Sequence, residues 1–225
     1  MKRKLVKMLR WISDDRKDAI TNMSLDEAIF NNYNNNPVLR TYLWDGRYTT
    51  IGYFQKAKEI KQTNFVRRFT GGLTVDHKND ISYCFIVSSI CWDVYNEVKT
   101  YKNIHLAIKN ALKSLNINPQ ILTCKGENVN NMCVNSFCEN DLFLNNKKIV
   151  GSCLRRRLNK VIIQGSVHLK LNDVDSSTFT KHFAKNLAEY LNTKTQKDYF
   201  YNKEIEIANM LAKEKYSTKN WNNKF

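Results

Sequence analysis

One short basic segment combines residue types that could bind a ligand. It is "RRFTGG", residues 67–72, in which two arginines precede a threonine and a diglycine. The chain has only seven glycines in 225 residues, so a pair beside two cations stands out. Glycine lets the backbone come close to an anionic or carbonyl-bearing group. The alternative interpretation is a tight hairpin turn with exposed arginines.

The composition indicates a folded domain. Hydrophobic residues make up 42% of the chain and aromatic residues 12%, which is typical of globular proteins. No apolar run approaches the roughly 18–20 residues that cross a bilayer, and the basic residues 1–17 lack the apolar core of a secretory signal. We expect a single domain over residues 1–225, cytoplasmic and without a membrane partner. A transit peptide or a membrane-touching arm stays open for the N-terminus.

Charge and cysteine usage limit the classes of partner. The net charge of +15 raises nucleic acid as a partner. The lysines are scattered, however, and no helix-turn-helix, zinc-finger or RNA-recognition signature occurs, so we disfavour nucleic acid and keep acidic proteins open. The six cysteines form no C-x-x-C pair and indicate reduced thiols in a cytosol-like compartment. The four dispersed histidines predict no metal site.

The order of the expected elements predicts an α+β fold. A helix with a Ser24–Glu27 capping box is expected in residues 22–33. Residues 38–54 read as two strands around an Asp45-Gly46 turn, and further strands follow in residues 63–87, with the diglycine between them. Residues 103–117 form an amphipathic helix, residues 140–154 and 160–171 form strands, the first bent at Asn145-Asn146, and residues 179–191 and 203–216 are helical. This mixture lacks a regular βαβ rhythm.

Four segments in this order carry a family resemblance: "NMSLDEAI", "RRFTGGLTVDH", "NNKKIVGSCLRRR" and "IIQGSVHL". Together with "GYFQ" and the closing "EKYSTKNW", they resemble the lipoate-protein ligase and octanoyltransferase family, whose fold is shared with biotin protein ligase. The resemblance covers about residues 11–221. It implies mixed β-sheets flanked by helices and a catalytic domain of the biotin/lipoate protein ligase type.

The resemblance also implies the site. The turn at the diglycine would cradle the head of an activated acyl group, and Lys148 takes the place of the family lysine that contacts the acyl carbonyl. Arg68 and Lys148 would supply positive charge where an oxyanion develops, whereas Lys147 reads as a solvated neighbour. The implied acyl- or substrate-binding residues are Arg68, Thr70, Gly71, Gly72, Val75, His77, Gly151, Ser152, Gln164, Gly165 and Ser166.

Cys133 is the candidate nucleophile. In one type of octanoyltransferase in this family, a loop cysteine lies fifteen residues before the lysine, and Cys133 has that spacing from Lys148. A thiol suits transfer between two thioesters, followed by formation of a stable amide. A nearby lysine would favour the thiolate. Alternatively, Cys133 is one of six small buried residues. Cys138 is the expected bystander, and Cys84 is expected in the core.

Two departures from the family pattern keep a second activity open. Gln164 stands where the family usually has histidine, and it cannot carry a proton. "CENDLFLNNKKI" also resembles the ligase pattern Arg-Asn-Asp-Leu, with Glu139 in place of the arginine. Asp141 could therefore be a magnesium ligand or a carboxylate that orients the lysine.

Three functions follow as hypotheses. The first is transfer of an octanoyl or lipoyl group from acyl carrier protein to a lysine of an acidic lipoyl domain, such as glycine cleavage H protein or a 2-oxoacid dehydrogenase E2 subunit, without a cofactor. The second is an ATP- and Mg²⁺-dependent lipoate ligase, although the chain leaves no room for the accessory domain that ligases commonly use. The third is a basic nucleic-acid-binding protein without catalysis. The arginines at residues 155–157 could dock an acidic partner or form a solvated strand end.

Overall fold

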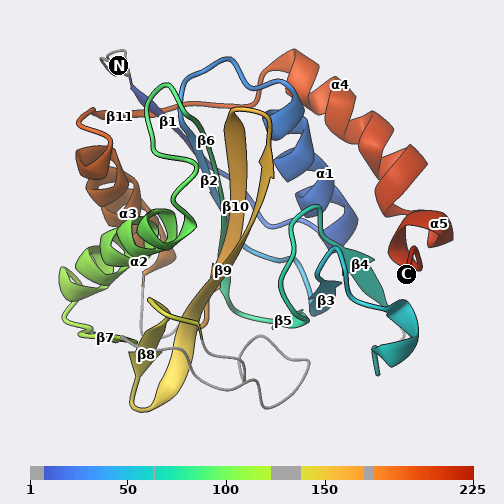
Figure 1. The fold of residues 1–225 in the computed structure, drawn as a ribbon, viewed down its shortest axis with the longest axis horizontal. Coiled ribbons are helices and arrows are strands. Elements are labelled where there is room, and N and C mark those ends of the chain that lie inside the picture. Colours follow the sequence, from blue (N-terminus) through green and yellow to red (C-terminus); the bar gives the residue numbers. More distant parts are fainter. Residues whose placement is uncertain (1–7, 63, 123–137, 170–174) are drawn as a thin grey trace.

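An eight-stranded mixed sheet forms the centre of the computed structural model, which describes residues 8–62, 64–122, 138–169 and 175–225. The strand order is β11-β1-β2-β6-β10-β9-β8-β7, and a smaller sheet has the order β4-β3-β5 (Figure 1). The strands are β1 Leu9–Ser13, β2 Val38–Tyr42, β3 Tyr48–Ile51, β4 Phe65–Arg67, β5 Val75–His77, β6 Ile81–Ser88, β7 Gln120–Ile121, β8 Leu142–Leu144, β9 Lys147–Arg157, β10 Lys160–Val167 and β11 Thr195–Lys197. The helices are α1 Ala19–Asn31, α2 Glu97–Lys113, α3 Ser176–Tyr190, α4 Asn202–Leu211 and α5 Lys219–Asn222, with a 3₁₀ turn at Ala57–Glu59 and a π turn at Ala212–Tyr216.

Helices cover both faces of the large sheet. Helices α2 and α3 lie on one face, and α1, backed by α4, lies on the other (Figure 1). Alternate side chains of a strand point to opposite faces, so Tyr83 and Phe85 pack in the α2–α3 core while Cys84 and Ile86 pack against Phe30 of α1. Every residue of β6 is therefore buried. The predicted α+β class is confirmed.

The first helix begins earlier than predicted. Asp18 caps α1 by accepting a hydrogen bond from the Thr21 N–H, so the helix starts at Ala19. The expected capping box at Ser24 and Glu27 is wrong. Ser24 lies inside the helix, where its hydroxyl donates to the Ile20 carbonyl one turn back. None of the helices in the described parts of the chain is long and apolar enough to cross a membrane.

The chain between β2 and β3 passes from one sheet to the other. The prediction of two strands around Asp45-Gly46 is confirmed, but the two strands do not pair as a hairpin. Strand β2 pairs with β1 and β6, whereas β3 pairs with β4 and β5. The small sheet therefore stands apart from the large one and carries the diglycine loop toward it. A hydrophobic pattern predicts strands, but it does not say which neighbour each strand takes.

The predicted bend at Asn145-Asn146 is a two-residue hairpin loop. Strands β8 and β9 pair in antiparallel fashion on either side of it. Both asparagines have positive φ, 49° and 60°. Tight hairpin turns of this kind need two residues in the left-handed region, and asparagine enters that region more readily than most residues.

Candidate active site

A cavity lies between the diglycine loop and strands β9 and β10. Most of the residues implied by the family motifs line it, namely Arg68, Gly72, Val75, His77, Lys148, Gly151, Ser152, Gln164, Gly165 and Ser166. Thr70, Gly71 and Asp141 lie outside its lining, although Thr70 and Asp141 hydrogen-bond or pair with residues that form it. Cys133 lies outside the described residues, so its placement stays a prediction. The two sheets thus bring together motifs that are far apart in the sequence.

Glycine is required at two places where the loops meet. Gly72 has a φ of +84°, which L-residues with a side chain rarely adopt. A Cβ on Gly52 would lie 1.8 Å from the Gly72 carbonyl oxygen, so only glycine lets the two backbones touch. Gly71 is different, because a Cβ there would meet nothing within 4 Å. The diglycine therefore combines one conformationally constrained residue with one that faces open space.

The two arginines before the diglycine hold different parts of the structure. Arg67 donates to the carbonyls of the 52–55 loop and of Asn222 in α5, and it clamps the C-terminal segment onto β4. Arg68 donates to Thr50 Oγ1 at 2.7 Å and to the carbonyls of Gly71 and Leu73, which shapes the diglycine loop. Both arginines are buried, and β4 and β5 both pair with β3, not with each other. The interpretation as a hairpin turn with exposed arginines is therefore wrong.

The Arg68 guanidinium could still make a further hydrogen bond and an ion pair. None of the described carboxylates lies within ion-pair distance of its guanidinium, and its buried Nε has no hydrogen-bond partner in the described parts of the chain. A buried cation without a counter-ion is costly. An anionic group bound in the cavity beside it would offset that cost.

A bulge turns Lys148 toward the cavity. In the β8–β9 pairing, Leu142 lies opposite Val150 and Phe143 lies opposite Lys148, so β9 has one extra residue between them. In a regular strand without a bulge, Lys148 and the buried Val150 would share a face, because they are two residues apart and side chains alternate. With it, Lys148 lines the cavity. Bulges often re-aim a side chain in this way next to active sites.

Asp141 fixes the ammonium group of Lys148. The Lys148 Nζ lies 2.7 Å from Asp141 Oδ2, and the side chains of Lys148 and Asp141 are 5% and 4% exposed. The same carboxylate oxygen accepts the Cys138 N–H at 2.8 Å. Lys147, one residue earlier, is exposed. The arrangement suits the interpretation of Asp141 as the carboxylate that orients the lysine.

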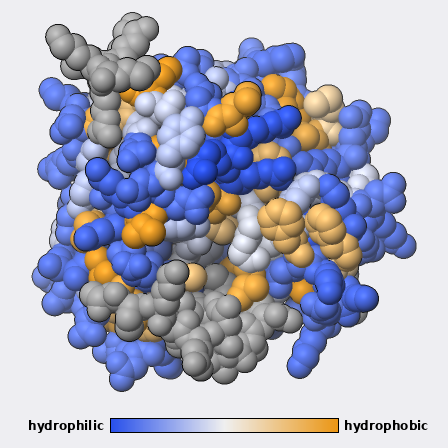
Figure 2. Space-filling model, viewed as in Figure 1, coloured by the Kyte–Doolittle hydropathy of each residue, from blue (hydrophilic) through white to orange (hydrophobic). Residues whose placement is uncertain are grey.

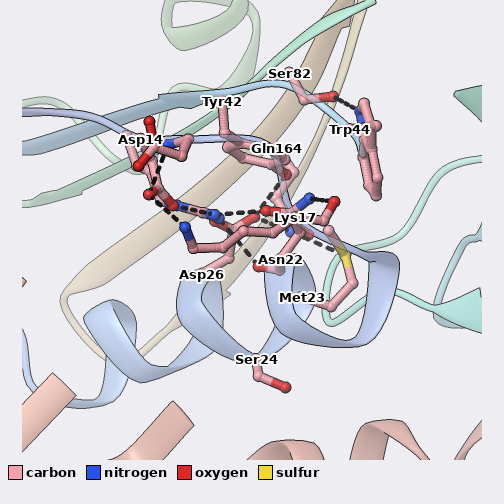
Figure 3. A network of polar contacts seen from close by, with 12 residues as sticks. Asp14, Lys17, Asn22, Met23, Ser24, Asp26, Tyr42, Trp44, Ser82 and Gln164 are labelled. Atoms are coloured by element: carbon pink, nitrogen blue, oxygen red, sulfur yellow. Dashed lines mark hydrogen bonds and ion pairs between the residues drawn. The ribbon is translucent and has the colours of Figure 1, made fainter. Parts of the chain in front are cut away.

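Gln164 links α1 to the diglycine loop, and Figure 3 shows its side chain near Asp26 of α1. Its Nε2 donates to Asp26 Oδ2 at 2.7 Å, and its Oε1 accepts from Thr70 Oγ1 at 2.7 Å. Thr70 Oγ1 also lies 3.0 Å from Cys153 Sγ. Burial raises the pKa of Asp26, and the guanidinium of Arg40 opposes this effect. The glutamine thus connects a buried carboxylate on α1 to the diglycine loop through bonds that need no proton transfer.

A third buried carboxylate, Asp80, binds residues that line the cavity. Asp80 Oδ2 accepts from His77 Nδ1 at 2.8 Å and from Ser82 Oγ at 2.9 Å, and Trp44 stacks on the His77 ring at 3.9 Å. Burial would raise the pKa of Asp80, but His77 and these hydrogen bonds hold it well below its usual range. The His77 Nε2 lies 2.8 Å from the hydroxyl of Thr50, which Arg68 also contacts. His77 is therefore fixed on both ring nitrogens.

The cysteines differ sharply in their surroundings. Cys84 is fully buried in the core, as expected, and burial raises the pKa of its thiol well above the ordinary value. Cys138 is exposed. Cys153 is partly exposed and lines the cavity, which the sequence analysis did not foresee. Its position two residues after Gly151 on β9 was the available signal, because alternate residues share a face.

Seven other residues that were not expected from the sequence also line the cavity. They are Met23, Tyr42, Trp44, Thr50, Leu73, Ser82 and His168. Burial lowers the pKa of His168, which favours its neutral form. Met23 lies on α1, Tyr42 on β2, Thr50 on β3 and Ser82 on β6, and the other three residues lie just beside β2, β5 and β10. Met23, Leu73 and His168 lie inside the quoted family segments but were not singled out there. The other four lie outside those segments, and their common location depends on how the two sheets pack.

The run of three arginines on β9 is mostly engaged within the molecule. Arg155 donates to the Phe69 carbonyl and stacks over the Phe69 and Tyr53 rings. Arg156 pairs with Glu97 at 2.9 Å, and Arg157 is exposed. Arg155 and Arg156 thus make contacts within the protein and are not simply solvated, while docking of an acidic partner by this run stays a prediction. The face shown in Figure 2 is nevertheless mostly hydrophilic, in keeping with the charge of +15.

Curated relatives share much of this chain. It is 29% identical to the octanoyltransferase LipM of Clostridioides difficile and 30% identical to that of Brevibacillus brevis, over 71% and 77% of its own length. It covers 65% and 70% of those proteins, or about two thirds of their length. With the octanoyltransferase LipM of Bacillus anthracis it is 26% identical over 95% of this chain and 97% of that protein.

Solved structures show the same fold. A lipoate-protein ligase A bound with ATP aligns with a TM-score of 0.79 and 22% identity over 96% of this chain and 98% of that one. The bipartite lipoate protein ligase of Thermoplasma acidophilum, studied with its E2 lipoyl domain, aligns with a TM-score of 0.77 and 22% identity over 96% of each chain. The family model of the lipoyl protein ligase A/B catalytic domain matches residues 18–214. The chain therefore belongs to the lipoyl protein ligase A/B catalytic-domain family.

Proposed function

We propose that this protein is an acyltransferase that moves an octanoyl or lipoyl group onto a lysine of a lipoyl domain, with Cys133 as the intermediate carrier. Three relatives that are 26–30% identical to it carry the name octanoyltransferase LipM, which supports this activity. The observation that carries the proposal is the buried Lys148–Asp141 pair, which presents an ammonium group to the cavity beside the diglycine loop.

The reaction has two balanced steps. The Cys133 thiol loses its proton, and the resulting thiolate attacks the carbonyl carbon of an octanoyl thioester on a carrier protein. The bond to the carrier sulfur breaks, and the leaving sulfur takes up one proton in place of the one that Cys133 lost. The neutral ε-amine of the acceptor lysine then attacks the new thioester. An amide forms, and the Cys133 thiol is released.

Lys148 supports both steps by stabilising charge on the acyl oxygen. The carbonyl oxygen becomes negative in each tetrahedral intermediate, and a fixed ammonium group lowers the energy of that charge. Asp141 keeps the ammonium group in place before the substrate arrives. Arg68 holds the diglycine loop opposite and adds positive charge to the same cavity.

The substrates follow from this chemistry. The donor is octanoyl-acyl carrier protein, and the acceptors are acidic lipoyl domains such as glycine cleavage H protein and 2-oxoacid dehydrogenase E2 subunits. One structural neighbour was studied with its E2 lipoyl domain, which supports an acceptor of this class. The net charge of +15 favours association with acidic partners. This reaction needs no cofactor.

Transfer from octanoyl carrier protein to a purified lipoyl domain tests the proposal. We expect the wild-type protein and Cys138→Ala to octanoylate the acceptor lysine, and Cys133→Ala to be inactive. ATP and lipoate are absent from the assay. Equal activity of Cys133→Ala and wild type would contradict the proposed carrier.

An ATP-dependent lipoate ligase is the second candidate, because Asp141 beside Lys148 also matches the ligase pattern and a structural neighbour binds ATP. The residues fit a magnesium ion at Asp141 poorly, since Oδ2 already pairs with Lys148 and accepts the Cys138 N–H. No group of three or more His, Cys, Asp or Glu side chains suited to a metal occurs among the described residues. Lipoate-dependent exchange of pyrophosphate into ATP, unchanged in Cys133→Ala, would favour the ligase.

A further inference from the structure

His105 is a buried histidine that neither the motifs nor the proposed reaction uses. It lies on the inner face of α2 between apolar residues, Ile104 and Ile108 among them, and is 1% exposed. Burial lowers the pKa of its imidazole, which is therefore neutral near pH 7. A polar side chain in such a place costs stability unless its hydrogen bonds are made. Its two hydrogen-bond partners identify the parts of the structure that His105 connects.

The two ring nitrogens of His105 bind different parts of the site. Nδ1 lies 2.7 Å from the Asn140 carbonyl oxygen. A carbonyl can only accept, so Nδ1 carries the proton, and Nε2 of the neutral ring is an acceptor. Nε2 lies 2.5 Å from Ser152 Oγ on β9, so the serine donates to it.

Ser152 is itself fixed from a second side. The Tyr83 hydroxyl lies 2.5 Å from Ser152 Oγ and donates to it, since the serine proton goes to His105. Gly165 makes room for this contact, because a Cβ there would lie 2.4 Å from the Tyr83 ring. The hydrogen-bond chain Tyr83–Ser152–His105–Asn140 therefore runs from β6 through β9 and α2 to the turn before β8.

The far end of this chain is the turn that carries Asp141. Asn140 has a φ of 75°, and its N–H and the Asp141 carbonyl both pair with Leu122. The next side chain, Asp141, binds the Lys148 ammonium at 2.7 Å. Lys148 and Ser152 lie on the same strand, so His105 joins the strand of the lysine to the turn of its carboxylate.

We propose that His105 is a positioning residue for Lys148. It holds the Asn140-Asp141 turn at a fixed distance from β9, so that the carboxylate keeps the ammonium pointing into the cavity. The bond to the Asn140 carbonyl is the important one, since it acts directly on the turn. The role in acyl transfer rests on the proposed function, but the effect on Lys148 itself does not.

Reactivity of the lysine toward an acylating reagent tests the proposal without any enzymatic assay. The folded full-length protein is treated with a limiting amount of N-hydroxysuccinimide acetate, and acetylation is mapped by peptide mass spectrometry. We expect His105→Leu and Asp141→Asn to raise the labelling rate of Lys148 roughly tenfold, because a buried ion pair withholds the amine from the reagent. Lys147, exposed on the same strand, is the internal control and should react equally in all variants.

Two conservative variants separate the two hydrogen bonds. His105→Asn places an N–H near the position of Nδ1 and should keep Lys148 close to its wild-type rate. His105→Gln reaches the position of Nε2, loses the bond to Asn140 and should behave like His105→Leu. Wild-type labelling in His105→Leu, or rescue by Gln and not by Asn, would overturn the proposal even if the melting temperature of the variant falls. In a transfer assay, a lower kcat with unchanged KM should accompany the faster labelling.

Discussion

Arg40 and Lys148 are two buried cations that pair with carboxylates, and they differ in what else surrounds them. Arg40 is fully buried between Asp14 and Asp26, with ion-pair distances of 2.7 and 2.6 Å. Its Nη1 and Nη2 also donate to the carbonyl and side-chain oxygens of Asn22. Lys148 pairs with Asp141 on a hairpin near one edge of the sheet, and it lines the cavity.

The difference separates a structural pair from one that can act on a ligand. Arg40 holds α1 on the sheet and does not line the cavity. It supports the site through Asp26, which accepts from Gln164, and by stacking 3.9 Å over the ring of Tyr42, a cavity residue. Lys148 faces the cavity, so its ammonium group can turn toward a substrate oxygen. Changes at Arg40 should therefore alter stability, and changes at Lys148 should alter activity.

Arg40→Leu should give the largest effect on folding. It leaves Asp26 and Asp14 without their guanidinium partner, and breaking a buried pair in this way costs about 3–5 kcal/mol. Urea unfolding at pH 7 measures the free energy of unfolding. A loss below about 1 kcal/mol, the range of exposed pairs, would contradict the structural role.

Lys148→Ala should reduce octanoyl transfer by about 10²–10³-fold, the usual effect of removing one donor that stabilises an oxyanion. The rate constant is measured at saturating carrier protein, with circular dichroism to show that the variant is folded. Lys147→Ala is the matched control, one residue away and exposed, and should keep wild-type activity. Equal losses in both variants would remove the distinction between the two lysines.

Asp80→Asn should give a smaller effect that depends on pH. Asp80 is held by His77 and Ser82, and losing hydrogen bonds to a charged group costs about 2 kcal/mol at pH 7. The folded pKa of Asp80 is lowered, so this stability is present above the unfolded pKa of about 4 and is lost as the pH falls toward the folded value.

Urea unfolding of both proteins between pH 7 and pH 3 measures this dependence. The difference in free energy of unfolding between wild type and Asp80→Asn should become smaller as the pH falls. Asp15→Asn, at an exposed carboxylate, should follow the wild type throughout. A gap that widens toward acid would contradict the direction of the shift.

Local sequence patterns were sufficient for most elements, and the family resemblance pointed to many of the cavity residues. Alternation and turn residues predicted β4, β5, β6 and the β8–β9 hairpin, and the motif order predicted most of the cavity lining. Helix periodicity located α2 and α3, although α2 begins at Glu97, six residues before the expected start. The helices and strands depend largely on interactions between residues close in sequence, whereas the cavity residues were identified through the family resemblance.

Features that depend on packing between distant segments were not predictable from the sequence. The Ser24 capping box failed because Asp18 gives a better cap at an earlier position. The bulge that turns Lys148 becomes visible only from the register of β9 against β8. Cys153 lies inside a quoted family segment but was not singled out, and His105 lies in none of these segments; the partners of both side chains come from other strands and loops.

The location of the acyl group after reaction with octanoyl carrier protein tests the central claim most directly. The protein is incubated with the carrier, quenched in acid and mapped by peptide mass spectrometry. We expect one octanoyl group on Cys133, formed more slowly in Lys148→Ala. An octanoyl group on Cys138 or on the cavity thiol Cys153, or an unmodified protein that still octanoylates a lipoyl domain, would contradict the account.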